Sequence, residues 1–69
     1  MRSAERSRPI PELSVVALKR AHECEGRVLP VGSRGAVVYA YRDGAAYEVD
    51  FSEPFPCVVT VGSDDIRPV

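Results

Sequence analysis

The chain has 69 residues and a formal net charge of -1, with 45% hydrophobic and 28% charged residues. This length allows one domain with a small core, and the composition is that of a globular protein, which excludes a disordered chain. Residues 1–11 contain three arginines and one glutamate, so residues 12–69 carry six basic and nine acidic groups. An acidic domain lacks the basic surface that phosphate backbones require, which disfavours nucleic acid as a principal partner.

No apolar run is long enough to span a membrane, and the start MRSAERSRPIP is charged where a secretion signal would be apolar. We therefore expect no membrane association and a cytoplasmic location. In that compartment cysteines are usually reduced, so Cys24 and Cys57 are expected to be free thiols.

Along the chain, residues 1–11 lack an apolar period and contain two prolines, which predicts a flexible arm before a domain over residues 12–69. The segment LSVVALKR (13–20) also fits a helical spacing, but its adjacent valines favour a strand. Residues 21–35 combine three glycines and a proline with polar residues, which predicts a long loop.

The segments GAVVYAYR and AAYEVDF flank Asp43-Gly44, a dipeptide typical of the two-residue type I′ turn of a β-hairpin. Such a turn pairs Arg42 with Ala45 and Tyr41 with Ala46 and so fixes the register of the hairpin. The predicted core face is Ala36, Val38, Ala40, Tyr47, Val49 and Phe51. The predicted opposite face is Val37, Tyr39, Tyr41, Ala46, Glu48 and Asp50.

The remaining segments complete an all-β pattern. Two prolines in SEPFP (52–56) interrupt any ladder, CVVTV (57–61) has the length of a strand, and GSDD (62–65) is a turn before a last short strand, IRPV. The order of a strand, a long loop, a hairpin and two further strands is similar to a small five-stranded SH3-like β-barrel.

Three segments also carry a resemblance to a known family: ELSVVALKR, VGSRGAVVYAYRDGAAYEVDF and VVTVGSDDIRPV. They resemble a family of small bacterial proteins catalogued as domain of unknown function number 4926, over about residues 12–69. Its pattern has a Leu-Asp-Val-Val-Ala-Leu start, a Gly-Thr-Val-Val strand and an acidic Tyr-Glu-Val-Glu-Phe strand. This chain departs from that pattern at Ser14 and in residues 52–56. The resemblance supports the architecture and implies no catalytic residues, cofactor or partner.

Catalytic and metal sites are poorly supported by the residue pattern. His22, Glu23, Cys24 and the distant Cys57 lack the two closely spaced ligand pairs of a zinc site and a third group to orient a nucleophile. The Gly32-Ser33-Arg34-Gly35 segment precedes a strand, so it does not form a phosphate loop at a helix N-terminus. We therefore expect a non-enzymatic protein that holds no metal or cofactor.

With catalytic and metal sites poorly supported, a binding role is the function that the sequence favours. Tyrosines are common at recognition surfaces, and loops or strands on a rigid scaffold often carry recognition. The predicted contact face for a protein partner consists of Tyr39, Tyr41, Glu48 and Asp50, with Arg42 at its rim. The alternative to this placement is that the tyrosines pack under the long loop or the N-terminal arm, and that the carboxylates only form a solvent-exposed strand face.

Two other functions stay open at this stage. One is an antitoxin or immunity-type neutraliser, whose acidic face would cover a basic partner protein. The other is a KOW-like nucleic-acid module, which rests on the Gly35-Ala36-Val37-Val38 stretch and the arginine-rich arm. A homodimer through an edge strand is a further option.

Overall fold

The computed structural model describes residues 10–69, and all regular structure within them is β apart from one 3₁₀ turn. The elements are β1 (Val15–Leu18), β2 (His22–Cys24), β3 (Arg27–Leu29), β4 (Arg34–Tyr41), β5 (Ala46–Phe51), β6 (Cys57–Gly62), η1 (Ser63–Asp65) and β7 (Ile66–Pro68). The predicted all-β class is confirmed. Within residues 10–69 no helix could cross a membrane.

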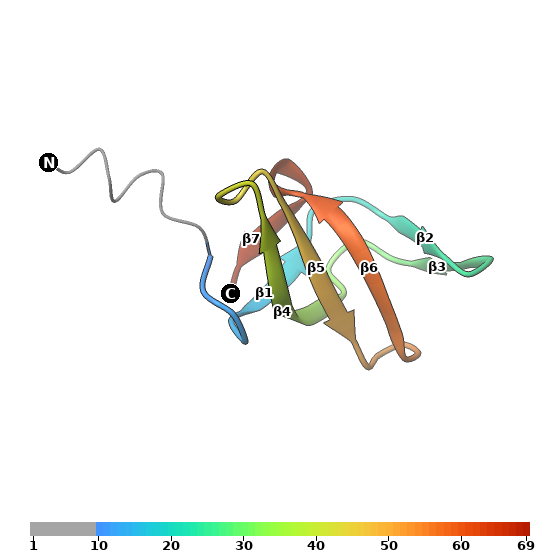
Figure 1. Cartoon of the computed structure of the whole chain (residues 1–69). Helices are drawn as coiled ribbons and strands as arrows, with labels where there is room; N and C mark the ends of the chain where they lie inside the picture. The colour runs from blue at the N-terminus through green and yellow to red at the C-terminus, as the bar shows by residue number, and fades with distance from the viewer. Residues whose placement is uncertain (1–9) are drawn as a thin grey trace, which may run out of the picture.

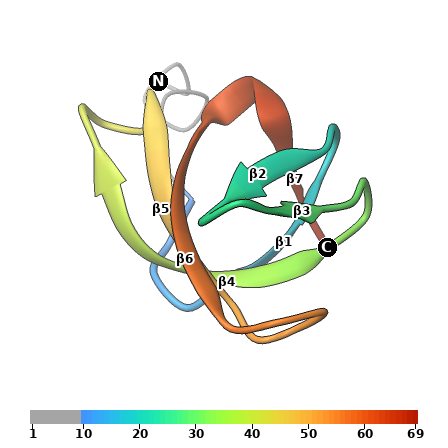
Figure 2. The ribbon, with the colours of Figure 1, turned by 90° about the vertical axis from the view of Figure 1, so that its right-hand side faces the viewer.

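Five of the strands form one antiparallel sheet in the order β6-β5-β4-β1-β7, while β2 and β3 form a separate hairpin that projects from one end (Figure 1). The large sheet is strongly curved around the core (Figure 2). Its edge strands β6 and β7 do not pair with each other. The five-stranded sheet is therefore an open one and does not close into the predicted barrel.

The segment predicted as a long loop contains the β2–β3 hairpin instead, so that prediction was wrong. Glu25 and Gly26 both have positive φ, 54° and 79°, and form a tight turn that pairs Cys24 with Arg27. Leu29 of β3 is fully buried, which attaches the hairpin to the core. The sequence around this turn gives little indication of strands, because β2 and β3 are short and contain few apolar residues.

The β4–β5 ladder contains a β-bulge at Val38. The predicted register holds near the turn, where Tyr39 pairs with Glu48 and Tyr41 with Ala46, but it shifts by one residue beyond the bulge, where Val37 pairs with Val49. An extra residue in one strand reverses the alternation of its side chains from that point on.

Because of the bulge, the faces predicted for Ala36, Val37 and Val38 of β4 were wrong. Val37 is fully buried, whereas Val38 is 37% exposed, the reverse of the prediction for both. Ala36, also predicted in the core, lies on the other side of the strand from its buried neighbours Gly35 and Val37. On β5 the predicted core residues are buried as expected, and they are Tyr47, Val49 and Phe51.

The turn of this hairpin contains the predicted Asp43-Gly44 pair and also Arg42. The carbonyl of Tyr41 accepts hydrogen bonds from the N–H groups of Gly44 and Ala45, both at 3.0 Å. Arg42, Asp43 and Gly44 have φ of 49°, 58° and 101°, so the positive φ predicted for Asp43 and Gly44 is confirmed and extends to Arg42. The ladder ends at Tyr41 and Ala46, and residues 42–45 connect the strands. Within this connection the Arg42 carbonyl accepts a 3.4 Å hydrogen bond from the Ala45 N–H.

Gly35 permits the close approach of β4 to β5. A Cβ atom at this position would lie 2.7 Å from a methyl group of Val49 and 2.9 Å from both the Asp50 carbonyl oxygen and the Phe51 ring. Every other residue type carries that Cβ, so the sequence requires glycine here for packing.

The core fills the concave side of the sheet. Its buried members are Val16, Leu18, Cys24, Leu29, Val37, Tyr47, Val49, Phe51, Phe55, Cys57, Val61 and Ile66. Of the predicted flexible arm, residues 1–9 lie outside the described residues. Ile10 packs against the core, and its N–H donates a hydrogen bond of 3.0 Å to the Tyr47 hydroxyl.

Candidate functional site

The surface of the sheet opposite the core presents a mixed set of apolar, aromatic and acidic side chains. Cross-strand pairing brings them together from β1, β4, β5 and β6, since Val15 pairs with Ala36, Ala36 with Asp50 and Asp50 with Val58. We call this surface the outer face and define it by Val15, Ala36, Tyr39, Tyr41, Ala46, Glu48, Asp50, Val58 and Thr60.

The two tyrosines predicted as contacts lie side by side on the outer face. Tyr39 and Tyr41 follow each other at alternate positions of β4, and their rings meet edge to face with centroids 4.7 Å apart. They are 51% and 37% exposed, so neither packs under a loop of the described chain. The structure thus presents an aromatic pair to solvent.

Glu48 is held against this aromatic pair. The Tyr41 hydroxyl donates a 2.9 Å hydrogen bond to Oε1 of Glu48 across the β4–β5 ladder. This hydrogen bond, aided by partial burial and by the negative charge of Glu48, raises the pKa of Tyr41 above its ordinary value. Tyr41 is therefore a protonated donor at neutral pH, and it fixes the orientation of the carboxylate.

Glu48 and Asp50 occupy alternate positions of β5, which puts their Cβ atoms about 7 Å apart on the outer face. Among residues 10–69 Arg20 forms an ion pair with Asp65 at 3.0 Å, and Nε2 of His22 lies 3.0 Å from the same carboxylate. Neither carboxylate of the outer face thus has a basic partner in the part of the chain that the structure describes.

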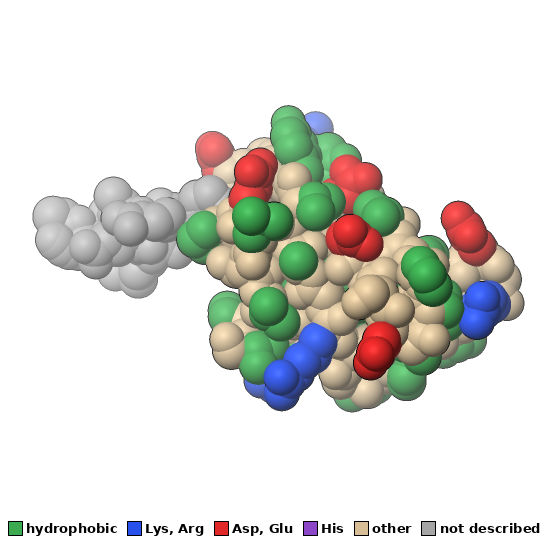
Figure 3. Space-filling model, turned by 90° about the horizontal axis from the view of Figure 1, so that it is seen from below, with side chains coloured by type: hydrophobic (Ala, Val, Ile, Leu, Met, Phe, Trp, Pro, Cys, Tyr) green, Lys and Arg blue, Asp and Glu red, His purple; other side chains and the backbone are tan. Residues whose placement is uncertain are grey.

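Acidic and hydrophobic side chains are interspersed on the face of the molecule seen from below, where the basic side chains lie toward the margins (Figure 3). The structure places Arg42 in the turn beyond Tyr41, exposed and with positive φ. Arg42 is therefore close in sequence to the aromatic pair but extends from the end of the hairpin. Its predicted contact at the rim of the outer face stays a prediction.

A shallow hollow adjoins Asp50. It has a volume of about 350 Å³ and is lined by Val15, Arg34, Gly35, Ala36, Asp50 and Ser52. The small side chain of Ala36 lies between its larger cross-strand neighbours Val15 and Asp50, which gives the sheet surface a depression at this point. A second, open groove of about 550 Å³ lies between the turns at residues 30–33 and 52–54.

Sequence reasoning missed Val15, Val58 and Thr60 as members of the outer face. Val15 and Val58 are 46% and 51% exposed. The run CVVTV is continuous in apolar residues apart from Thr60, yet in the structure Val58 and Thr60 are exposed while Cys57 and Val61 are buried. Thr60 is the one polar residue in this run, and it was the only indication in the sequence that one face of β6 is exposed.

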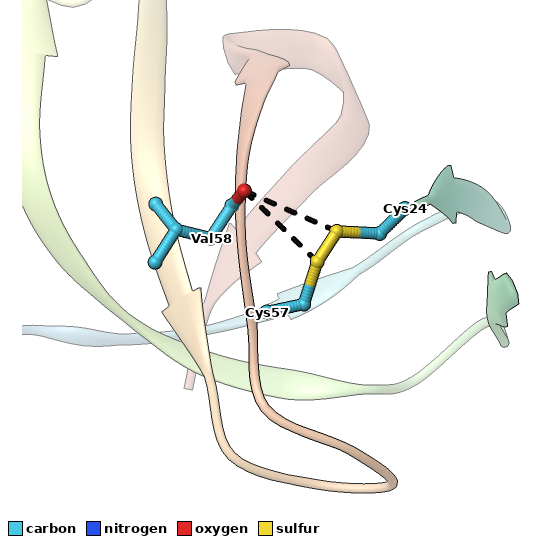
Figure 4. The surroundings of a disulfide bond; sticks show 3 residues. All are labelled: Cys24, Cys57 and Val58. Carbon is cyan, nitrogen blue, oxygen red and sulfur yellow. Dashed lines mark hydrogen bonds between the residues drawn. A yellow bond between two sulfur atoms is a disulfide. The ribbon is translucent and has the colours of Figure 1, made fainter. Parts of the chain in front are cut away.

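The residues considered for metal or thiol chemistry have other roles. Cys24 of β2 and Cys57 of β6 are joined by a disulfide, with Cα atoms 6.7 Å apart, so the expectation of free thiols was wrong (Figure 4). Both sulfurs lie near the carbonyl oxygen of Val58, at 3.9 and 4.0 Å. The bond links the projecting hairpin to the edge of the sheet, two segments that the sequence separates by 33 residues.

His22 is likewise engaged, because its Nε2 lies 3.0 Å from Oδ2 of Asp65. No group of three or more His, Cys, Asp or Glu side chains within residues 10–69 is placed to hold a metal ion. In the Gly32-Ser33-Arg34-Gly35 segment, the Ser33 hydroxyl donates to the Pro30 carbonyl at 2.7 Å, and β4 begins at Arg34. This segment is thus the turn that leads into a strand.

Comparison with known proteins places the chain in a family by sequence. No curated protein and no solved structure matches it. A family model described as "Domain of unknown function (DUF4926)" matches residues 12–67, which include every strand of the sheet up to the middle of β7. The chain therefore belongs to the DUF4926 family.

Proposed function

We propose that the protein is a non-catalytic binding module that contacts a protein partner through the outer face. The observation that carries this proposal is the exposed Tyr39–Tyr41 pair beside two carboxylates, on a face that the core does not use. Exposed tyrosines bring much contact area and, with only two side-chain torsions, lose little conformational entropy on binding. Arg42 is proposed to contribute at the rim.

The architecture is proposed to be SH3-like although the sheet is open. Support comes from the order of elements, in which a long excursion follows β1 and a short 3₁₀ turn precedes the last strand, β7. In this scheme the β2–β3 hairpin is an elaboration of the first long connection.

A neutraliser of a basic protein is the second candidate, and it is favoured by the charges of Glu48 and Asp50, which have no basic partner within residues 10–69. A KOW-like nucleic-acid role would depend on arginines within residues 1–9, which lie outside the described residues, and the acidic domain counts against it. Homodimer formation through an edge strand, β6 or β7, stays a prediction.

A cytoplasmic location also stays a prediction. The disulfide counts against this location, because cytosolic thiols are generally kept reduced. Trapping thiols with an alkylating reagent at the moment of lysis, followed by mass spectrometry, would show in which state the pair exists in the native host.

The contact surface can be tested by affinity capture from a lysate of the native host. The test variant combines Tyr39→Ser, Tyr41→Ser, Glu48→Lys and Asp50→Lys. The control combines Val28→Ser, Val31→Ser, Glu23→Lys and Asp64→Lys, which makes the same change in charge and a similar loss of exposed apolar surface away from the outer face.

We expect the test variant to lose the protein that the wild type captures, while the control retains it and both keep the wild-type circular dichroism. Each anchoring aromatic contributes about 2 kcal/mol where it acts as a binding hot spot. Equal capture by the folded test variant would show that the outer face is not the contact surface.

A further inference from the structure

The outer face carries negative charge that no basic side chain of the described chain neutralises. Glu48 and Asp50 lie on β5, between β4 and β6, among the neutral side chains of the outer face. Arg34 lies near Asp50 at the edge of this face, but the ion pair that Arg20 forms with Asp65 within residues 10–69 involves neither carboxylate. When a partner covers this partly apolar surface, water is excluded from around the two carboxylates. Such a surface is complementary to a cationic group on that partner.

The geometry around Glu48 favours one kind of cation. Tyr41 donates its hydroxyl to Oε1 at 2.9 Å, while Oε2 makes no hydrogen bond within residues 10–69. The Tyr39–Tyr41 ring pair lies beside Glu48 on the neighbouring strand, where Tyr39 is its cross-strand partner. A guanidinium group can stack on an aromatic ring and donate to a carboxylate at once, whereas an ammonium group is more strongly hydrated and has no planar face.

A second anionic position lies two residues along β5. Asp50 lines the hollow beside Ala36, about 7 Å from Glu48 by strand geometry. Arg34 lines the same hollow but forms no ion pair with Asp50. Side chains at alternate positions of an extended segment repeat at the same distance, so such a segment aligned with β5 can reach both carboxylates.

Resting on the proposed function, we propose that the outer face binds an extended segment of a basic protein that carries arginines at alternate positions. One arginine lies against Tyr39 and Tyr41 and pairs with Glu48. The next one pairs with Asp50 at the hollow, while Val15 and Val58 contact the apolar side chains between and beside them.

A second copy of the chain fits this face poorly. In a two-fold symmetric dimer the same patch meets itself, which would place Glu48 and Asp50 of one protomer opposite those of the other. Like charges so placed oppose association. The charge pattern therefore favours a partner of a different sequence.

The experiment uses a capped peptide, Thr-Thr-Arg-Val-Arg-Thr-Thr, titrated into the full-length protein and followed by proton–nitrogen correlation NMR. Three matched peptides carry lysine, citrulline or glutamate in place of both arginines. Citrulline keeps the shape of arginine without its charge. Variants Glu48→Gln and Asp50→Asn are compared with Glu23→Gln and Asp64→Asn, which remove exposed carboxylates elsewhere.

We expect the arginine peptide to cause saturable chemical-shift changes in the outer-face residues of β4, β5 and β6. The lysine peptide should bind more weakly at the same residues, and the citrulline and glutamate peptides should cause no changes. Glu48→Gln should weaken binding about fivefold, and Glu23→Gln and Asp64→Asn should not change it. Binding by the wild type should also weaken as ionic strength rises from about 0.01 to about 0.15 M.

The proposal is overturned if the arginine peptide gives no saturable shifts, if the citrulline peptide binds equally well, or if the shifts lie outside the outer face. The salt dependence of the wild type needs no variant, so misfolding of a mutant cannot decide the result. Loss of natural-partner capture by the outer-face variant, together with failure of the arginine peptide, would keep the proposed function and refute only the partner chemistry.

Discussion

Two adjacent valines in β4 provide a direct test of the bulge, because the same substitution at each should have very different costs. Val37 is fully buried among core residues, and Val38 is 37% exposed. Val37→Ala removes two methyl groups from the core at about 0.8 kcal/mol each and leaves a small cavity, for a total of about 2 kcal/mol. Val38→Ala should cost less than about 1 kcal/mol.

Urea titrations of both variants, followed by circular dichroism, measure this difference. The loss of a β-branched residue from a strand is common to the two, so their difference isolates burial. In thermal melts Val37→Ala should lower Tm by roughly 10 °C in a domain of this size. Equal costs, or a larger cost for Val38→Ala, would show that the strand continues without a bulge and that the predicted faces were right.

Three further changes test other parts of the structure. Gly35→Ala should destabilise the fold by about 1 to 3 kcal/mol in urea titrations, because its Cβ would lie 2.7 Å from a valine methyl group of β5; unchanged stability would mean that the strands are farther apart. Reduction of the Cys24–Cys57 disulfide should cost about 3 to 4 kcal/mol through the loop that it closes, and a mass shift on alkylation without prior reduction would show that the bond is absent. The raised pKa of Tyr41 favours folding below the ordinary tyrosine pKa, and this contribution is lost as pH rises through the raised value. In near-ultraviolet titrations Glu48→Gln should lower the pKa of Tyr41, and identical curves for the variant and the wild type would refute the hydrogen bond.

The sequence by itself determined the all-β class and the central hairpin. Alternation of small or apolar with polar side chains from Tyr39 to Phe51 is local, and it placed both tyrosines and both carboxylates on the outer side of β4 and β5. The prolines of residues 52–56 ended that hairpin because they cannot donate to a ladder. The predicted contact residues are therefore close in space for reasons visible in the chain.

Only the tertiary structure decided which valine enters the core. Val37 and Val38 have the same side chain, so no pattern of polarity distinguishes them, and the choice depends on how β4 packs against β5 and β1. The β2–β3 hairpin was not predicted because it, too, depends on contacts with distant parts of the chain. Its stability comes from Leu29 in the core and from the disulfide, while its own side chains are mostly exposed.

The disulfide and the full outer face also required the folded structure. Cys24 and Cys57 are brought together by the packing of the hairpin against β6, and nothing local to either cysteine indicates this pairing. Val15 and Val58 join the carboxylates because the sheet order sets β1 and β6 on either side of β4 and β5. Alternation within a strand is a local property that a sequence displays, whereas strand order and the packing of one hairpin on another depend on contacts between distant residues.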